Sequence, residues 1–250
     1  MTQTRTALVT GASRGIGAEI AAGLAGRGYD VALNDIPARE GELRGLAERI
    51  EAMGRRALVQ FADVSDKAQI EAMAAEVLDG FGHVDAVVNN AGILIAGEVD
   101  GLPEETWDTV MDVNAKGAFM VIQAFLPAMK ARGYGRIVNI ASIGGKHGAP
   151  GQAHYSASKA AIMGFSRVLA QEVGTAGITV NCVCPGIIMT EMGRVNLEDP
   201  AVSEAWREKT AMARIGTPED VVGPVAFFAS DDAAFVTGQT LNVDGGIVFS

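Results

Sequence analysis

Short apolar or β-branched runs alternate with longer amphipathic stretches along the chain, and this rhythm constrains the fold more than any other feature. Alternating strands and helices are typical of α/β proteins, in which helices cover both faces of a parallel sheet. We predict a doubly wound fold with seven strands, at residues 6–10, 30–35, 56–64, 84–92, 135–142, 177–186 and 239–246. About six helices are expected, among them residues 16–27, 38–53, 67–80, 103–131 and 154–175.

The rhythm runs through all 250 residues without a linker or a low-complexity segment. We therefore predict one domain over residues 1–250, of a size that one large core can support. The connection at residues 187–216 is unusually long and carries Met189, Met192 and Trp206 among charged residues. Long connections in compact domains are usually functional or mobile, so this one is predicted to be a substrate lid.

Charge and hydropathy exclude two classes of partner. The chain has 20 basic and 30 acidic residues, a formal charge of −10, so we expect no nucleic-acid binding. No apolar stretch reaches the roughly 18–20 residues of a membrane span, and the N-terminus lacks the apolar core of a signal peptide. The expected compartment is the cytoplasm. Cys182 and Cys184 are one residue apart on a predicted strand, and we expect buried, unpaired thiols and no metal site.

Polar and glycine residues gather where the predicted strands end, which is where ligands bind in such sheets. Gly11, Gly15 and Gly17 join the first strand to a helix, whose N-terminus can receive a diphosphate. Asp35 ends the second strand, where it can accept hydrogen bonds from the adenosine ribose. Asp63 follows the third strand and either binds the adenine edge or caps the next helix, as Ser65 can also do.

Ser142 ends the fifth strand, and Tyr155 and Lys159 follow at helical spacing on one face. A tyrosine with a pKa near 10 needs a shift of about 3 units, or about 4 kcal/mol, to act as a base near neutral pH. An ammonium about 5 Å away supplies roughly 3 kcal/mol at an effective dielectric of about 20. We therefore predict that Lys159 lowers the pKa of Tyr155 and makes it a usable acid or base.

These residues jointly resemble the short-chain dehydrogenase/reductase family in its ~250-residue form. The match consists of TGASRGIG at residues 10–17, Asp63, NNAG at residues 89–92, Asn114, Ser142, YSASK at residues 155–159, and Pro185 and Gly186 followed by Thr190. The resemblance implies a Rossmann-like parallel sheet in the order 3-2-1-4-5-6-7. It also implies a homotetramer, in line with a second apolar face on the helices expected at residues 103–131 and 154–175.

The resemblance implies a role for each matching residue. Tyr155 would transfer the proton, Ser142 would hold the substrate oxygen, and Lys159 would bind the nicotinamide ribose. Asn114 would hold a water that connects Lys159 to solvent, and Thr190 would meet the nicotinamide carboxamide. The expected cofactor-binding residues are Gly11, Ser13, Arg14, Gly15, Ile16, Gly17, Asp35, Asp63, Val64, Asn90, Ala91, Gly92, Tyr155, Lys159, Pro185, Gly186, Ile188 and Thr190. The expected substrate-binding residues are Ser142, Gln152, Tyr155 and Met192.

The predicted function is hydride transfer between NAD(P) and a small-molecule secondary alcohol or ketone. Asp35 would repel the 2′-phosphate of NADP, whereas Arg14 and Arg39 would attract it. Because a strand end fixes Asp35, we predict NAD as the cofactor, with NADP as the alternative.

The residues expected near the substrate indicate different substrate classes. Met189, Met192 and Trp206 favour an apolar ligand, whereas Arg194, Gln152 and His147 suit hydroxyls or a carboxylate, so polyols or sugars and 3-oxoacyl compounds stay open. His154 is an alternative substrate contact, and His83 is expected in a surface loop. Epimerase or dehydratase chemistry, and a non-catalytic nucleotide-binding protein, are alternative functions. The first usually has a different glycine loop and a longer C-terminal domain, and the second would be expected to lose a catalytic residue.

Overall fold

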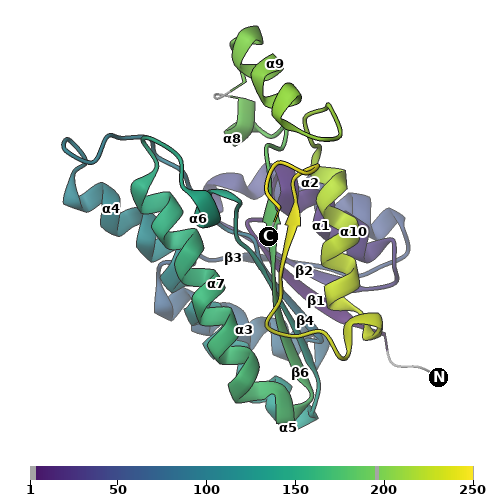
Figure 1. Ribbon diagram of the computed structural model, residues 1–250. Helices are drawn as coiled ribbons and strands as arrows, with labels where there is room; N and C mark the ends of the chain where they lie inside the picture. Colours follow the sequence, from purple (N-terminus) through teal and green to yellow (C-terminus); the bar gives the residue numbers. More distant parts are fainter. Residues whose placement is uncertain (1–3, 195–196, 250) are drawn as a thin grey trace.

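The computed structural model describes residues 4–194 and 197–249 and contains one seven-stranded sheet in the order β3-β2-β1-β4-β5-β6-β7 (Figure 1). All six neighbouring pairs are parallel. The strands are β1 (Thr6–Thr10), β2 (Asp30–Asp35), β3 (Ala57–Phe61), β4 (Ala86–Asn89), β5 (Gly135–Ile140), β6 (Ile178–Pro185) and β7 (Thr240–Val243). The predicted fold class and strand order are confirmed.

Helices cover both faces of the sheet because the central strands are apolar on both sides (Figure 1). In β1, Ala7 and Val9 face one core cluster, while Leu8 faces the other, as the two-residue period of a strand requires. One cluster is closed by α1 (Gly15–Ala25), α2 (Glu40–Ala52) and α10 (Pro218–Ala229). The other is closed by α3 (Lys67–Phe81), α5 (Gly117–Arg132) and α7 (Ala153–Val173).

The helix expected at residues 103–131 is not continuous. It consists of α4 (Glu104–Met111), a π-helical turn η2 (Asp112–Lys116) and α5. A π-turn inserts one residue into the helical repeat and often marks a functional position. Here the turn contains the buried Asn114. The helix expected at residues 154–175 is α7 followed by the short turn η3 (Gly174–Ala176).

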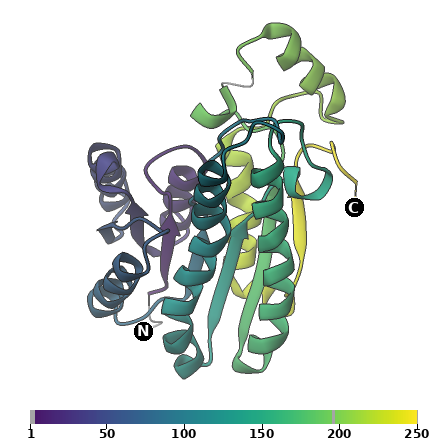
Figure 2. The ribbon, with the colours of Figure 1, turned by 90° about the vertical axis from the view of Figure 1, so that its left-hand side faces the viewer.

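The chain after β6 is more helical than expected. It contains α8 (Glu191–Arg194) and α9 (Pro200–Lys209), which project beyond the carboxyl ends of the strands (Figures 1 and 2). A further short helix, α6 (Gly144–His147), follows β5, and short turns occur at η1 (Pro37–Arg39) and η4 (Asp231–Ala233). No helix in the described ranges is long and apolar enough to cross a membrane.

One alternative for Asp63 is removed, and one local prediction is wrong. The N-cap of α3 is Asp66, whose carboxylate accepts the backbone N–H groups of Ala68 and Gln69, so neither Asp63 nor Ser65 caps this helix. His83 is 5% exposed rather than on the surface. Its Nε2 lies 3.1 Å from the buried carboxylate of Asp85, which draws the imidazole inward. Cys182 and Cys184 are both buried and unpaired, as predicted.

Candidate active site

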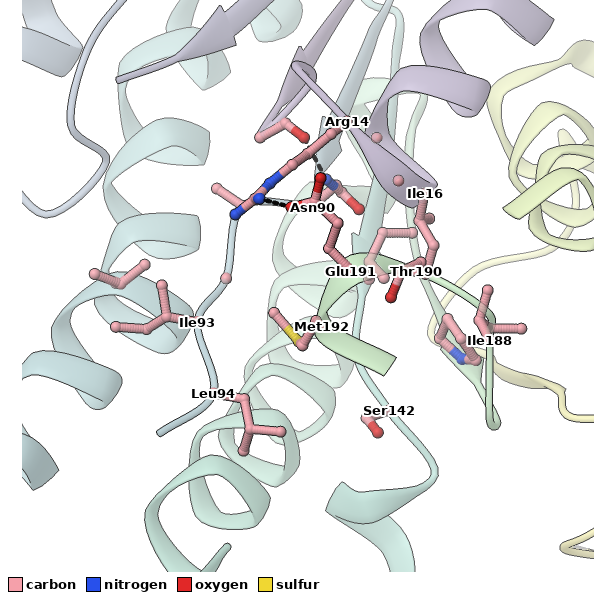
Figure 3. A pocket seen from close by; sticks show the side chains of 18 of the residues that line it. Arg14, Ile16, Asn90, Ile93, Leu94, Ser142, Ile188, Thr190, Glu191 and Met192 are labelled. Atoms are coloured by element: carbon pink, nitrogen blue, oxygen red, sulfur yellow. Dashed lines mark hydrogen bonds and ion pairs between the residues drawn. The ribbon is translucent and has the colours of Figure 1, made fainter. Parts of the chain in front are cut away.

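A cleft of about 620 Å³ opens at the carboxyl ends of the strands, where the strand order reverses between β1 and β4 (Figure 3). All the expected cofactor-binding and substrate-binding residues line this one cleft. Asn114 is the one member of the predicted catalytic set that lies behind its wall. Residues from six strand ends therefore meet as the sequence predicted.

The glycine-rich loop after β1 forms the floor at one end. Gly11 has φ of 63°, a conformation that favours glycine. A Cβ on Gly17 would lie 2.1 Å from the Gly11 carbonyl oxygen, so only glycine fits there. Asn90 fixes the loop by donating its side-chain amide to the carbonyls of Thr10 (3.0 Å) and Gly11 (2.9 Å).

This end fits a diphosphate. The N-cap residue of α1, Arg14, makes no side-chain cap hydrogen bond, so no cap from that residue occupies the first N–H groups of the helix. Such N–H groups and the helix dipole attract phosphate. The buried Ser13 hydroxyl oxygen also lacks a hydrogen-bond partner in the described structure. Together, these groups suit the pyrophosphate of a dinucleotide.

The carboxylate of Asp35 is held at the end of β2. It accepts the backbone N–H groups of Ser13 (3.1 Å) and Ile36 (2.9 Å). The two arginines expected to oppose it are both engaged by acids. Arg14 pairs with Glu191, and Arg39 pairs with Glu42 at 3.2 Å. Asp35 therefore stands at this end of the cleft with both nearby arginines held in ion pairs.

Ser142, Tyr155 and Lys159 meet at the other end of the cleft. The Ser142 hydroxyl lies near enough to Tyr155 to lower the pKa of the phenol, and its Oγ accepts the Gly144 N–H at 3.0 Å. Lys159 is 4% exposed, and its Nζ donates to the Ile140 carbonyl at 2.9 Å. The same Nζ lies 5.7 Å from the centre of the Tyr155 ring. A phenol, a hydroxyl and a buried ammonium thus share one corner of the cleft.

Burial dominates the electrostatics of this corner. It raises the pKa of Tyr155, and the nearby Ser142 hydroxyl opposes this only in part. It also lowers the pKa of Lys159 from 10.5 to about 8. The predicted lowering of the Tyr155 pKa by Lys159 is therefore not found. Desolvation of the phenol dominates its pKa, and the Lys159 ammonium donates to the Ile140 carbonyl at 2.9 Å.

Asn114 links the chain after β4 to α7. Its Nδ2 donates to the Ile93 carbonyl (2.9 Å) and the Ser158 hydroxyl (3.1 Å), and its Oδ1 accepts the Ile93 N–H (2.8 Å). A Cβ on Gly92 would lie 3.2 Å from that Oδ1 and 3.3 Å from Lys159 Nζ. Asn114 thus lies close to Lys159 while its amide is bonded to protein groups.

The substrate end combines predicted and unpredicted residues. Gln152 lines it as expected. Met192 also does so, and Ile93 and Leu94 line it without having been predicted (Figure 3). Their apolar run directly after NNAG was the available signal. Glu191 was also missed, because no periodic pattern links it to the glycine loop.

Not all of the other residues considered as substrate contacts lie in the cleft. His154 is fully buried, 6.4 Å from the Trp107 ring, so it is a core residue rather than a substrate contact. His147 lies on α6 and, like Met189 and Trp206, is not among the cleft residues. The side chain of Arg194 lies outside the described part of the structure. Residues 4–194 and 197–249 contain no cluster of three metal-ligating side chains.

The chain is similar to proteins of known class over nearly its full length. A family model described as "Enoyl-(Acyl carrier protein) reductase" matches residues 11–248. The 3-oxoacyl-[acyl-carrier-protein] reductase FabG of Staphylococcus aureus is 41% identical over 99% of both chains. The (2S)-[(R)-hydroxy(phenyl)methyl]succinyl-CoA dehydrogenase subunit BbsD of Thauera aromatica is 42% identical over 98% of this chain and 96% of its own.

A solved structure of a gluconate 5-dehydrogenase from Burkholderia cenocepacia, in complex with NADP and tartrate, superposes with a TM-score of 0.93. It is 37% identical and covers 97% of this chain and 94% of its own. The fold and the site thus define an NAD(P)-dependent oxidoreductase that acts on CH–OH groups. The chain belongs to the short-chain dehydrogenase/reductase family.

Proposed function

We propose that this protein is an NAD(H)-dependent enzyme that interconverts a ketone and a secondary alcohol, with Tyr155 as the proton donor and acceptor. The observation that carries the proposal is the meeting of Ser142, Tyr155 and the buried Lys159 in the same cleft as the glycine loop. When bound, the nicotinamide supplies or receives the hydride. The protein's own groups manage the substrate oxygen and its proton.

In the reduction, Ser142 donates a hydrogen bond to the ketone oxygen, and Tyr155 transfers its phenolic proton there as negative charge develops. Burial raises the pKa of Tyr155 and keeps the phenol protonated, which is the form that a reduction needs. Lys159 would bind the nicotinamide ribose. Asn114 bonds to the backbone of Ile93 and to Ser158 on α7, and so fixes that wall of the cleft relative to α7. Thr190, which lines the cleft, would contact the nicotinamide carboxamide.

NAD(H) is the proposed cofactor. Asp35 is fixed by two backbone N–H groups, so it cannot withdraw from a 2′-phosphate without losing them. Arg14 and Arg39 already have acidic partners. The gluconate 5-dehydrogenase complex contains NADP, which keeps NADP as the alternative for a direct assay.

We favour a 3-oxoacyl compound over a polyol or sugar acid as the substrate. Ile93, Leu94 and Met192 offer apolar contacts beside Ser142, whereas Gln152 is an amide with two polar atoms. A polyol would leave several hydroxyls without partners on these side chains. The FabG and BbsD relatives are named for thioester substrates, whereas gluconate dehydrogenases appear among the structural relatives.

We propose a homotetramer whose subunits each form one domain over residues 1–250, with residues 187–216 as a substrate lid. The assembly is supported by apolar side chains that α5 and α7 expose, among them Phe119 at 42% and Val168 at 54%. Phe119 packs edge-on against Phe165 at 5.9 Å, so the two helices share this face. The unpaired thiols of Cys182 and Cys184 are in keeping with the cytoplasm.

The test is a two-by-two assay followed by cofactor absorbance. Acetoacetyl-CoA and 5-ketogluconate are each offered with NADH and with NADPH. The proposal predicts the highest kcat/KM for acetoacetyl-CoA with NADH. A preference for 5-ketogluconate would reverse the substrate assignment, and a preference for NADPH would reverse the cofactor assignment. Absence of turnover in every combination would contradict the assigned reaction on these two substrate classes.

A further inference from the structure

An ion pair joins two distant segments across the mouth of the cleft: Arg14 and Glu191 contact through their side chains (Figure 3). Arg14 lies in the glycine-rich loop, and Glu191 is the first residue of α8, directly after Thr190. Both side chains are well exposed, at 46% and 66%. An exposed ion pair adds little to folding stability, so its effect is to be sought in what its partners can bind.

The backbone of Arg14 lies beside the end of the cleft where the adenosine ribose is expected. Its neighbour Ser13 donates its backbone N–H to Asp35 at 3.1 Å. A 2′-phosphate at that end would need a cation, and a guanidinium from this loop is well suited to bind it. In this structure, the guanidinium is instead bonded to Glu191. The second arginine at this end, Arg39, is bonded to Glu42.

We propose that Glu191 is a specificity-determining residue that favours NAD(H) by occupying Arg14. The inference rests on the proposed use of a nicotinamide dinucleotide. A 2′-phosphate has to displace the Glu191 carboxylate before it can bind the guanidinium, whereas a 2′-hydroxyl does not. Asp35 discriminates from the strand end by repulsion, and Glu191 discriminates from the opposite side by competition. The two carboxylates therefore act through separate contacts.

The position of Glu191 links this selectivity to the segment after β6. A Cβ on Gly15 would lie 3.4 Å from Thr190 Cγ2, so this segment already packs on the glycine loop. The ion pair ties the following residue to the same loop. Binding of a 2′-phosphate by Arg14 breaks that tie, whereas binding of an unphosphorylated ribose leaves it intact. NADP(H) thus loses a contact that NAD(H) retains.

Calorimetric binding of ADP-ribose and 2′-phospho-ADP-ribose to the full chain tests the proposal without any turnover. The measured quantity is the dissociation constant for the phosphorylated ligand divided by that for ADP-ribose. Glu191→Gln is expected to lower this ratio by about fivefold, the size expected when one exposed ion pair no longer competes. Glu191→Ala should act in the same direction. Glu204→Gln on α9, which removes the same charge from an exposed pair with Arg207, is the matched control and should leave the ratio unchanged.

Glu191→Gln is also measured in an Arg14→Ala background. This comparison separates competition for the Arg14 guanidinium from a general change in the electrostatic potential of the cleft. The ratio should then respond little to Glu191→Gln, because the cation that Glu191 occupies is gone. An unchanged ratio in the Arg14-containing protein would overturn the inference, and so would an equal fivefold change without Arg14. If the wild-type protein bound neither ligand, the proposed function would fail and this inference with it. Binding of ADP-ribose with an unaltered ratio would refute the inference alone.

Discussion

Lys159→Met is predicted to stabilise the protein at neutral pH while removing the charge that the proposed reaction needs. Lys159 is 4% exposed, and no carboxylate in the described part of the chain forms an ion pair with it. Burial lowers its pKa from 10.5 to about 8. At about 1.4 kcal/mol for each unit of pKa, this change corresponds to about 3 kcal/mol.

The direction in which the free energy of unfolding changes with pH follows from proton binding at Lys159. Between about pH 8 and pH 10.5 the unfolded chain binds more protons at Lys159 than the folded protein does. The stability of the wild-type protein therefore rises with pH across that window, and the full cost of burying the charge is present below about pH 8. Methionine carries no charge, so its advantage should shrink by about 3 kcal/mol toward pH 10.5. The lost hydrogen bond to Ile140 adds an offset that does not change with pH.

Urea denaturation of both proteins between about pH 7 and pH 10 measures this difference. One protein concentration is used throughout, because assembly couples stability to concentration. Lys130→Met, an exposed position near the end of α5, is the matched control and should show no such trend. A difference between Lys159→Met and wild type that stays constant with pH, or that grows as pH rises, would refute the reasoning.

Three further predictions concern selectivity, folding and assembly. Asp35→Ser should reduce the preference of kcat/KM for NAD(H) over NADP(H) by about 10- to 100-fold. The reason is that like charges about 4 Å apart cost up to roughly 4 kcal/mol before solvent screening. An unchanged preference would show that Asp35 does not select the cofactor. Asp66→Ala should lower the free energy of unfolding by about 1 kcal/mol through loss of the α3 N-cap, whereas Ser65→Ala should cost less, and the reverse order would contradict the observed capping. Light scattering should give about four times the 25.9 kDa chain mass, and a value near 25.9 kDa would exclude the tetramer.

The sequence alone was sufficient to predict the sheet and most residues of the cleft. Strand runs such as residues 6–10 and 135–140 are apolar on both faces, so their identity did not depend on distant contacts. Parallel strands bring their carboxyl ends to one edge, which is why Gly11, Asp35 and Ser142 could be assigned to one cleft from their positions alone.

Features that depend on side-chain choice in three dimensions were not predictable. Asp63, Ser65 and Asp66 are all capable caps, and only the backbone path selects Asp66. The burial of His83 depends on Asp85, which polar composition alone does not reveal. The π-turn around Asn114 leaves the apolar pattern of a helix almost unchanged.

The contact between Arg14 and Glu191 joins residues 177 positions apart, and no sequence period connects them. Likewise, the balance between burial and charge at Tyr155 required the position of the Lys159 ammonium. Spacing placed the two side chains on one helix face, but it did not reveal that the ammonium is directed to Ile140.

The central claim is that Tyr155 transfers the proton, and the kcat of Tyr155→Phe tests it most directly. The substitution keeps the ring and removes only the hydroxyl, so ADP-ribose affinity, measured on the same sample, reports that the cleft is intact. The kcat for acetoacetyl-CoA reduction is expected to fall by about 10²- to 10⁴-fold, the usual contribution of general acid catalysis, while ADP-ribose affinity changes less than about twofold. A variant that kept more than about a tenth of the wild-type kcat would contradict the claim.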